Sequence, residues 1–266
     1  MPFRNRNIKV VLSIHDINLL YDPSKAKLKK KRNLRRLQLL INQADVIICI
    51  SEFCKKDVLT HCDVKNKPVH VIYNGTNALA EPELLKQSYK PVKPFIFAVG
   101  TINPKKNFHT LLPLVEDEQE LELIIAGKID DRDYYQSIVD TIEKTGLSEK
   151  VKLVGPVSET EKSWYLNHCS AFAFPSTAEG FGLPVTEAMS VGKPLFLANA
   201  TALPEIGGDV AFYFDNFSAA HMKEVFVTGM KKYTENNMQD EIIKKGKEYS
   251  WDIAAQKYWN VYRSLY

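Results

Sequence analysis

The sequence predicts an α/β fold built on a doubly wound parallel sheet, and two observations support this prediction. Short apolar segments rich in β-branched residues alternate with longer helical patterns almost from end to end, which is typical of parallel βαβ construction. At 266 residues, with 45% hydrophobic and 25% charged side chains, the chain is also long enough to bury a substantial core in one large or two modest domains.

The first part of the chain contains three predicted strands, at residues 8–14, 45–50 and 69–73. The alternation then stops at an Asn-Gly turn followed by three prolines, a composition that favours a linker over a regular element. We therefore divide the chain into a partial N-terminal Rossmann-like domain, a linker, a complete C-terminal Rossmann-like domain and a final helix, at residues 1–77, 78–94, 95–250 and 251–266.

Six further strands follow the linker in strict alternation with helices, enough for a complete sheet of order 3-2-1-4-5-6. They are predicted at residues 95–100, 121–127, 151–155, 171–175, 194–198 and 211–215. In the final helix, apolar side chains recur at helical intervals, so we expect this helix to pack back on the N-terminal domain. These side chains are Ile253, Tyr258, Val261 and Leu265.

Composition and charge exclude several classes of protein. A net charge of +3 and a pI near 8.5 are too mild for a nucleic-acid binder, which usually has a concentrated basic face. The four cysteines show no metal-finger spacing and are interpreted as reduced thiols. No apolar stretch approaches the ~20 residues that span a bilayer, and we expect a cytoplasmic protein.

Two loops that carry charged residues and glycines are predicted to meet at the point where the sheet reverses its winding. Ligands of doubly wound sheets bind there, at the carboxyl ends of strands 1 and 4. The loop after strand 1 is TINPKKN and the loop after strand 4 is PSTAEGFGLP. This juxtaposition brings Lys105 and Lys106 opposite a glycine turn that opens a helix.

The residue types in these loops fit a nucleotide sugar. The helix start near Gly182 and Leu183 can hold a phosphate through its free N–H groups, and the two lysines can pair with a diphosphate. Glu179 and Glu187 are anions, so they are better suited to accept hydrogen bonds from sugar and ribose hydroxyls. Ordinary helix capping is the alternative interpretation of the same acid and proline pattern.

Several motifs in order resemble one family, the retaining glycosyltransferases of family 4, which have the GT-B fold. The motifs are AVGTINPKKN, LIIAG, VKLVGPVS, FPSTAEGFGLPVTEAMSVGKP and ALPEIGGDVAFYFD. The resemblance implies a nucleoside diphosphate sugar as donor substrate, with no cofactor and no bound metal. It implies that Glu179 faces the donor sugar, that Glu187 holds the ribose and that Lys106 contacts the diphosphate. It also implies donor contacts from the loop residues Gly180, Phe181, Gly182 and Leu183.

Two positions depart from or extend this pattern. Many members carry an arginine where this chain has Thr101, and Lys105 stands where one sub-group has an arginine, so the resemblance makes both donor-binding candidates. The segment SIHDINLL resembles the motif whose histidine approaches the donor sugar, which makes His15 a catalytic candidate. A histidine bonded within its local turn is the alternative.

Two acidic motifs have competing interpretations. Asp131 and Asp133 form an Asp-x-Asp pair, which binds a divalent metal in glycosyltransferases of another fold, but here the pair follows a strand and begins a helix, where acidic residues are favoured. Glu205 matches a family motif, Leu-Pro-Glu, and is equally well explained as a structural residue.

The segment 25–36, KAKLKKKRNLRR, concentrates positive charge with Leu28, Leu34 and Leu37 nearby. Such a stretch can lie on an anionic membrane surface, and the alternative is a solvated helix face. We expect peripheral association with the inner face of the plasma membrane and a glycan or lipid-linked acceptor.

The leading hypothesis is a retaining, metal-independent glycosyltransferase of cell-envelope polysaccharide synthesis. A nucleotide-sugar-binding subunit that needs a partner is the alternative, and a nucleotide-sugar epimerase is a third. Because only three strands precede the linker, we expect the partner to be a second copy of the chain or a separate N-terminal half.

Overall fold

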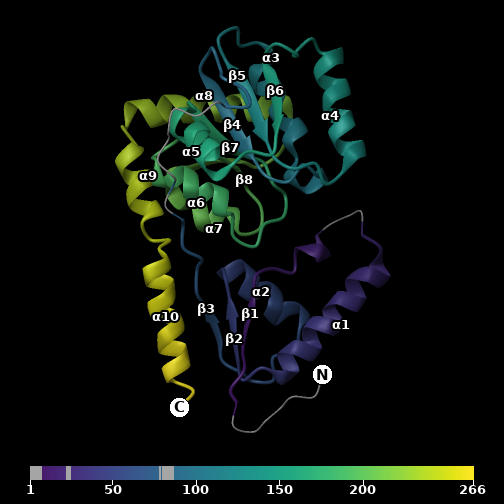
Figure 1. Cartoon of the computed structure of the whole chain (residues 1–266), viewed down its shortest axis with the longest axis vertical. Coiled ribbons are helices and arrows are strands. Elements are labelled where there is room, and N and C mark those ends of the chain that lie inside the picture. The colour runs from purple at the N-terminus through teal and green to yellow at the C-terminus, as the bar shows by residue number, and fades with distance from the viewer. Residues whose placement is uncertain (1–7, 22–24, 78, 80–86) are drawn as a thin grey trace.

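The computed structural model describes residues 8–21, 25–77, 79 and 87–266. Residues 1–7 of the predicted first domain and residues 78 and 80–86 of the predicted linker lie outside the described residues. The described chain forms two parallel sheets, one of three strands and one of six, in two lobes (Figure 1). We call these the N-lobe and the C-lobe. The predicted α/β fold class is confirmed.

The N-lobe alternates strands and helices in the order β1-β2-β3, with every pairing parallel. Ser51 caps helix α2 by accepting a hydrogen bond from the backbone N–H of Cys54. The elements are β1 (Val11–Ile14), the 3-10 turn η1 (Asn18–Leu20), α1 (Lys27–Gln43), β2 (Val46–Cys49), α2 (Glu52–His61) and β3 (Val69–Val71).

The C-lobe sheet has the order β6-β5-β4-β7-β8-β9, which is the predicted order 3-2-1-4-5-6. Its strands are β4 (Phe95–Val99), β5 (Glu122–Ala126), β6 (Val151–Gly155), β7 (Ala171–Phe174), β8 (Leu195–Ala198) and β9 (Ala211–Phe214). The connecting elements are η2 (Pro104–Lys106), η3 (Phe108–Leu111), α3 (Pro113–Glu116), α4 (Arg132–Lys144), α5 (Glu159–His168), α6 (Leu183–Ser190), α7 (Leu203–Gly207), η4 (Gly208–Val210), α8 (Ala219–Glu235) and α9 (Gln239–Gly246).

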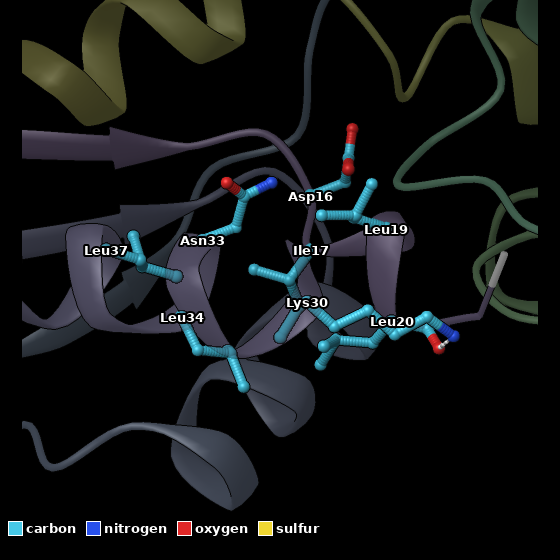
Figure 2. Close-up of a pocket in the computed structure, with 8 residues that line it drawn as sticks. All are labelled: Asp16, Ile17, Leu19, Leu20, Lys30, Asn33, Leu34 and Leu37. Carbon is cyan, nitrogen blue, oxygen red and sulfur yellow. Dashed lines mark hydrogen bonds between the residues drawn. The ribbon is translucent and has the colours of Figure 1, made fainter. Parts of the chain in front are cut away.

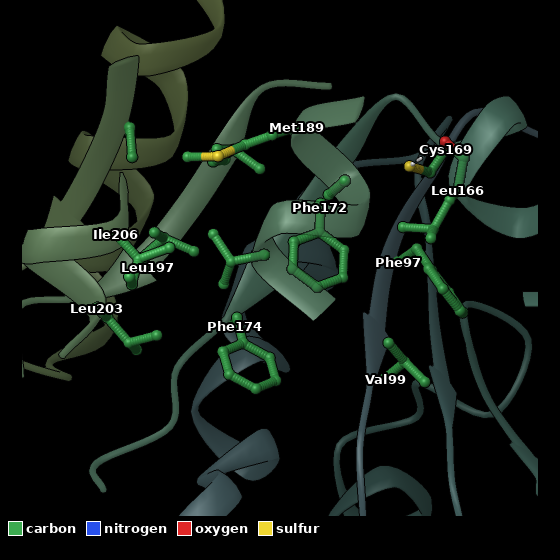
Figure 3. Close-up of a cluster of buried hydrophobic side chains, with 14 of the residues drawn as sticks. Phe97, Val99, Leu166, Cys169, Phe172, Phe174, Met189, Leu197, Leu203 and Ile206 are labelled. Carbon is green, nitrogen blue, oxygen red and sulfur yellow. Dashed lines mark hydrogen bonds between the residues drawn. The ribbon is translucent and has the colours of Figure 1, made fainter. Parts of the chain in front are cut away.

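The C-lobe sheet is covered on both faces, because every residue of β4, β5, β7 and β8 is buried. Successive side chains point to opposite faces, so Phe97 joins one core cluster while Ile96 joins the other. Figure 3 shows the first cluster, in which Phe97, Phe172 and Phe174 lie among aliphatic side chains from the helices. The carboxyl ends of the central strands are therefore fixed by a rigid core.

The last helix, α10 (Trp251–Arg263), runs along the N-lobe (Figure 1). Ala254 and Val261 form one buried cluster with Val46, Ile48 and Ile72 of the N-lobe sheet. Tyr258 and Leu265 pack against the same cluster. Ile253 does not join it and is 44% exposed, because Ala254 occupies the inward position of that turn.

The cysteines are present as thiols, in agreement with their interpretation from the sequence. All four are free thiols, and three of them are buried. Among the helices that the structure describes, none is long and apolar enough to cross a membrane.

Phe97→Ala should lower the free energy of unfolding by about 3–5 kcal/mol, because it leaves a cavity in a core that cannot close around it. Phe97 is fully buried and stacks on Tyr165 at 5.1 Å between ring centroids. Urea denaturation of both proteins measures the difference. Val227→Ala is the control, since Val227 is 60% exposed and its loss should change stability by less than about 0.5 kcal/mol. Equal effects of the two substitutions would contradict the described packing.

Candidate active site

The loops that follow β4 and β7 meet at the switch point of the C-lobe sheet, as the sequence predicts. Strand β4 pairs with β7, so the loops that follow these strands leave the sheet side by side. The backbone N–H of Thr177 donates to the carbonyl of Lys105 at 2.8 Å, and the Ser176 hydroxyl donates to the same carbonyl at 3.3 Å. The β7 loop is thus fixed against the β4 loop through its backbone.

Lys106 and Glu179 form a largely buried ion pair at the centre of this arrangement. The Lys106 Nζ lies 2.5 Å from Glu179 Oε1, and both side chains are about 85% shielded, with exposures of 16% and 15%. The Lys106 ammonium also lies 4.7 Å from the ring centroid of Phe174, a cation–π arrangement. The hydroxyl of Ser176 donates to the same Glu179 oxygen. These contacts fix the direction of both charged groups.

The glycine loop brings the N-lobe to Glu179. A Cβ atom on Gly180 would lie 2.3 Å from the carbonyl oxygen of His15, so only glycine permits this approach of the two backbones. His15 follows β1 directly and its side chain is exposed. The structure therefore brings the two predicted catalytic residues, His15 and Glu179, to the same boundary between the lobes.

A cavity of about 500 Å³ lies at the carboxyl ends of β4, β5 and β6, and we call it the strand-end cavity. Three of the predicted donor-binding residues line it: Thr101, Leu183 and Glu187. Gly182 directly precedes Leu183 and is the cap residue of α6, with a φ of 105° that favours glycine. Leu183 and Pro184, the first two residues of α6, line this cavity. Pro184 has no N–H group and the Val185 N–H donates to the Gly182 carbonyl at 2.9 Å, so Leu183 supplies the N–H of this turn that can meet a ligand.

Glu187 is the most polar buried group of the strand-end cavity. Its Oε1 accepts a hydrogen bond from the Lys162 ammonium at 2.8 Å, whereas its Oε2 is buried and has no partner within the described residues. Burial raises the pKa of the Glu187 carboxyl, and this effect exceeds the opposing effect of Lys162. The bonds to Glu159 and Glu187 raise the pKa of Lys162 in spite of its burial. An unpartnered carboxylate oxygen in a cavity is suited to accept a ligand hydroxyl.

Sequence reasoning missed Lys162. It lies in the first turn of α5, four residues after the capping Ser158, and nothing in its local sequence distinguishes it from a solvated helix lysine. Only the contact with Glu187, 25 residues later in the chain, gives it a place in the site.

Lys105 lies apart from the strand-end cavity. It lines a second cavity of about 530 Å³ between the lobes, the interlobe cleft, which is also lined by Asp16, Asn18, Asn103, Asp130, Asp131 and Thr177. Asn18 is only 6% exposed, and the amide oxygens of Asn18 and Asn103 are buried without a partner in the described part of the chain. The two adjacent lysines of the predicted diphosphate site therefore have different surroundings: Lys105 faces the interlobe cleft, whereas Lys106 lines neither cavity and is paired with Glu179.

Two further residues of the predicted motifs, Phe181 and Asp131, have contacts that support the fold. The Phe181 ring is 3% exposed and lies between Tyr73 and Tyr249, so a donor could meet Phe181 only at its backbone. Asp131 caps α4 by accepting a hydrogen bond from the Tyr134 N–H at 2.9 Å, which matches the helix-start interpretation.

Most of the basic segment 25–36 lies in α1. The leucines in and beside it differ in exposure. Leu34 and Leu37 face Ile17 and Leu20 of the segment before α1, where they line a small pocket of about 270 Å³ (Figure 2). Leu28 is 79% exposed. Of these three leucines, Leu34 and Leu37 therefore pack within the N-lobe, and Leu28 lies on the exposed basic face.

Comparisons with known proteins agree with this geometry. The model of the family described as glycosyl transferases group 1 matches residues 81–249, and that of glycosyltransferase family 4 matches residues 2–78. The O-antigen chain mannosyltransferase B of Escherichia coli is 23% identical over 285 residues, which cover 97% of this chain and 71% of that protein. The serotype-specific mannosyltransferase WbdA of Escherichia coli is 30% identical over 184 residues, which cover 62% of this chain and 22% of that protein.

Solved structures show the same fold. Sucrose-phosphate synthase from Thermosynechococcus elongatus gives a TM-score of 0.78 at 19% identity, covering 97% of this chain and 68% of that one. Anabaena Alr3699/HepE in complex with UDP and glucose gives a TM-score of 0.77 at 19% identity, covering 95% of this chain and 71% of that one. These likenesses confirm the predicted GT-B type fold.

The raised pKa of Glu187 predicts a stability effect with a defined sign. The folded protein holds this proton more tightly than the unfolded chain does. The contribution of Glu187 to stability is therefore greatest below the ordinary carboxyl pKa of 4.5, and it is lost as the pH rises through the folded value. Glu187→Gln should therefore gain stability relative to the wild type as the pH rises from 4.5 to 8. Urea unfolding across this range checks it, and a pH-independent difference would show that Lys162 fully compensates the buried charge.

Proposed function

This chain belongs to the glycosyl transferases group 1 family, and on that premise we propose that it moves a sugar, with retention of configuration, from a nucleoside diphosphate sugar to a glycan or lipid-linked acceptor. The observation that carries the proposal is the Lys106–Glu179 ion pair. It places a cation suited to a diphosphate and a carboxylate suited to sugar hydroxyls in direct contact, between the strand-end cavity and the interlobe cleft.

The donor nucleotide occupies the strand-end cavity. Glu187 accepts hydrogen bonds from the ribose hydroxyls through its unpartnered Oε2, while Lys162 holds the other oxygen, Oε1, in place. The diphosphate lies between the start of α6 and Lys106, whose side chain passes within 3.3 Å of the position that a Cβ on Gly100 would take. Gly100 lines the cavity and the Lys106 side chain lies directly behind it, so we place the diphosphate at the Gly100 border of the cavity.

The transfer step breaks the bond between the anomeric carbon and the diphosphate oxygen, and the electron pair leaves with the diphosphate. The acceptor hydroxyl oxygen forms the new bond on the same face of the sugar, and its proton passes to the departing phosphate oxygen. Lys106 and the α6 N-terminus stabilise the charge that develops on the diphosphate, which requires no bound metal. Glu179 and His15 hold the reacting sugar at the boundary of the lobes.

The acceptor occupies the interlobe cleft. The buried amide oxygens of Asn18 and Asn103 are hydrogen-bond acceptors without partners, and sugar hydroxyls are donors that would satisfy them. The neighbouring Asp16 carboxylate already accepts the N–H of Asn18, so the cleft offers several fixed acceptors rather than a dense positive field. This chemistry favours a sugar end over a phosphate end of the acceptor.

The named relatives support a role in polysaccharide assembly. The first two are mannosyltransferases, one of them of the O-antigen chain, so we propose mannose as the first donor sugar to test. The acceptor would be the growing sugar chain.

Transfer is tested with GDP-mannose, UDP-glucose and a mannobiose acceptor carrying an alkyl tail, with the product and its anomeric configuration identified by NMR. Lys106→Ala should weaken binding of the nucleotide by about 1–3 kcal/mol, since a charge-assisted contact is lost. Glu179→Gln should lower kcat and leave nucleotide affinity nearly unchanged, because its partner is the sugar. EDTA should have no effect.

Three results would contradict the proposal. Loss of nucleotide affinity alone in both variants would remove the division of roles between Lys106 and Glu179. Chelator-sensitive transfer would require a metal. Nucleotide binding without transfer to any acceptor would favour the binding subunit instead.

We also propose that the outer face of α1 contacts an anionic membrane. Six basic side chains are exposed on it together with Leu28: Lys27, Lys29, Lys31, Arg32, Arg35 and Arg36. The double variant Lys29→Glu with Arg36→Glu should lose binding to phosphatidylglycerol vesicles in co-sedimentation, because each basic residue contributes about 1 kcal/mol at such a surface. Lys231→Glu with Lys244→Glu, on the C-lobe helices α8 and α9, is the matched control. Equal loss in both variants would indicate a general charge effect.

A further inference from the structure

Glu205 joins the C-lobe to a helix of the N-lobe. It lies in α7, and its carboxylate accepts hydrogen bonds from the backbone N–H groups of Glu52 at 2.7 Å and Phe53 at 2.9 Å. These are the first two residues of α2, whose N–H groups have no partner inside their own helix. A carboxylate at this position also meets the positive end of the helix dipole.

A tyrosine of the N-lobe lies beside the same carboxylate. Burial, and after it the neighbouring Glu205 carboxylate, raise the pKa of the Tyr73 hydroxyl. The Tyr73 ring lies 6.2 Å from the ring of Phe181 and 5.7 Å from that of Tyr249. The N-lobe side of this contact therefore packs directly against the glycine loop.

A second contact connects the start of α2 to the glycine loop itself. The Ser51 hydroxyl donates to the carbonyl oxygen of Gly180 at 2.7 Å, and Ser51 is fully buried. The same hydroxyl accepts the N–H of Cys54 at 3.0 Å. The orientation of α2 thus determines where the residue next to Glu179 can lie.

The segment before α7 completes the connection from the C-lobe side. The Glu179 N–H donates to the Thr201 hydroxyl at 2.9 Å, and the Ala202 N–H donates to the Glu179 carbonyl at 3.4 Å. Glu205 follows Ala202 by three residues. One short segment, 201–205, therefore holds both the backbone of Glu179 and the start of α2.

We propose that Glu205 is a positioning residue for sugar transfer, and that its bonds to α2 hold the N-lobe, with His15, in the register that Glu179 requires. We call this set, Glu205 with the N–H groups of Glu52 and Phe53, the α2 clamp. The inference rests on the proposed function for its effect on turnover, but its structural part does not. Glu205 lines neither the strand-end cavity nor the interlobe cleft, so it acts through the position of other groups.

The chain supplies a matched control for the clamp. Glu122 also accepts two backbone N–H groups, those of Val92 and Lys93 at 3.2 Å each, and a tyrosine hydroxyl, that of Tyr89 at 2.7 Å. All of these partners precede or belong to the C-lobe sheet, and none belongs to α2. Glu122→Gln therefore removes the same kind of bonds without touching the contact between the lobes.

The test compares Glu205→Gln, Glu205→Ala and Glu122→Gln in the full chain. Three quantities are measured: the affinity for UDP by calorimetry, the radius of gyration by small-angle scattering, and kcat with the sugar donor that the wild type uses. The Glu205 variants should bind UDP within about twofold of the wild type and have a larger radius of gyration. Their kcat should fall by about tenfold or more, because misplacement of reacting groups by about 1 Å costs this much. Glu205→Ala should be more affected than Glu205→Gln. Glu122→Gln should change thermal stability while leaving the radius and kcat near wild type.

Ser51→Ala provides an independent variant, because it removes the bond to Gly180 and keeps Glu205. It should also lower kcat without weakening UDP binding, and its effect should be less than additive with Glu205→Gln because both act on α2. An unchanged radius of gyration and kcat in the Glu205 variants would overturn the inference. If the wild type transfers no sugar, the proposed function fails, while the radius of gyration still decides whether the clamp holds the lobes.

Discussion

The pairing of β4 with β7 is the constraint on which the rest of the site depends. Ile96 lies opposite Ala171 and Phe97 opposite Phe172, so two strands that are more than 70 residues apart end side by side. Because the strands are parallel, both loops leave the sheet at the same edge, and the Lys105 carbonyl can hold the backbone of Thr177. The contact of Lys106 with Glu179 then follows from the sheet, and the phenylalanine core beneath keeps it in place.

Much of this arrangement can be predicted from the sequence, and the reason lies in local patterns. The apolar runs mark all nine strands of the described residues. A doubly wound sheet leaves a small choice of strand orders, so the meeting of the KK and EGFG loops follows from topology. What could not be predicted depends on contacts between distant side chains. Lys162 acquires its role from Glu187, and Glu205 from the start of α2. Leu34 and Leu37 have the spacing of an outer face but pack inward, because the segment before α1 folds over them.

The site also contains buried polar atoms that have no hydrogen-bond partner among the described residues. Oε2 of Glu187 and the amide oxygens of Asn18 and Asn103 are buried without partners among the described residues, whereas the buried Glu122, far from both cavities, has a partner for each oxygen. Unpartnered polar atoms cost free energy in a folded protein, and proteins tolerate them mainly where function needs them. Among the described residues, the fourth such side-chain atom is the Thr76 hydroxyl, which lies outside both cavities. Three of the four therefore belong to the two cavities near the Lys106–Glu179 pair, which supports this pair as the centre of the site.

The chain crosses between the lobes twice, and the two crossings lie together. The Thr76 N–H donates to the carbonyl of Tyr249 at 2.9 Å, and Gly75 packs so closely on Trp251 that a Cβ there would lie 2.2 Å from the Trp251 nitrogen. Because both covalent connections lie at this one point, the lobes can rotate about it without stretching the chain. Such a rotation moves groups on the far side of the boundary further than groups beside Gly75, and it has to break the contacts of Glu205 with α2 and of Ser51 with Gly180. The ease of opening the boundary to substrates would then be set by those few contacts rather than by the unfolding of either lobe.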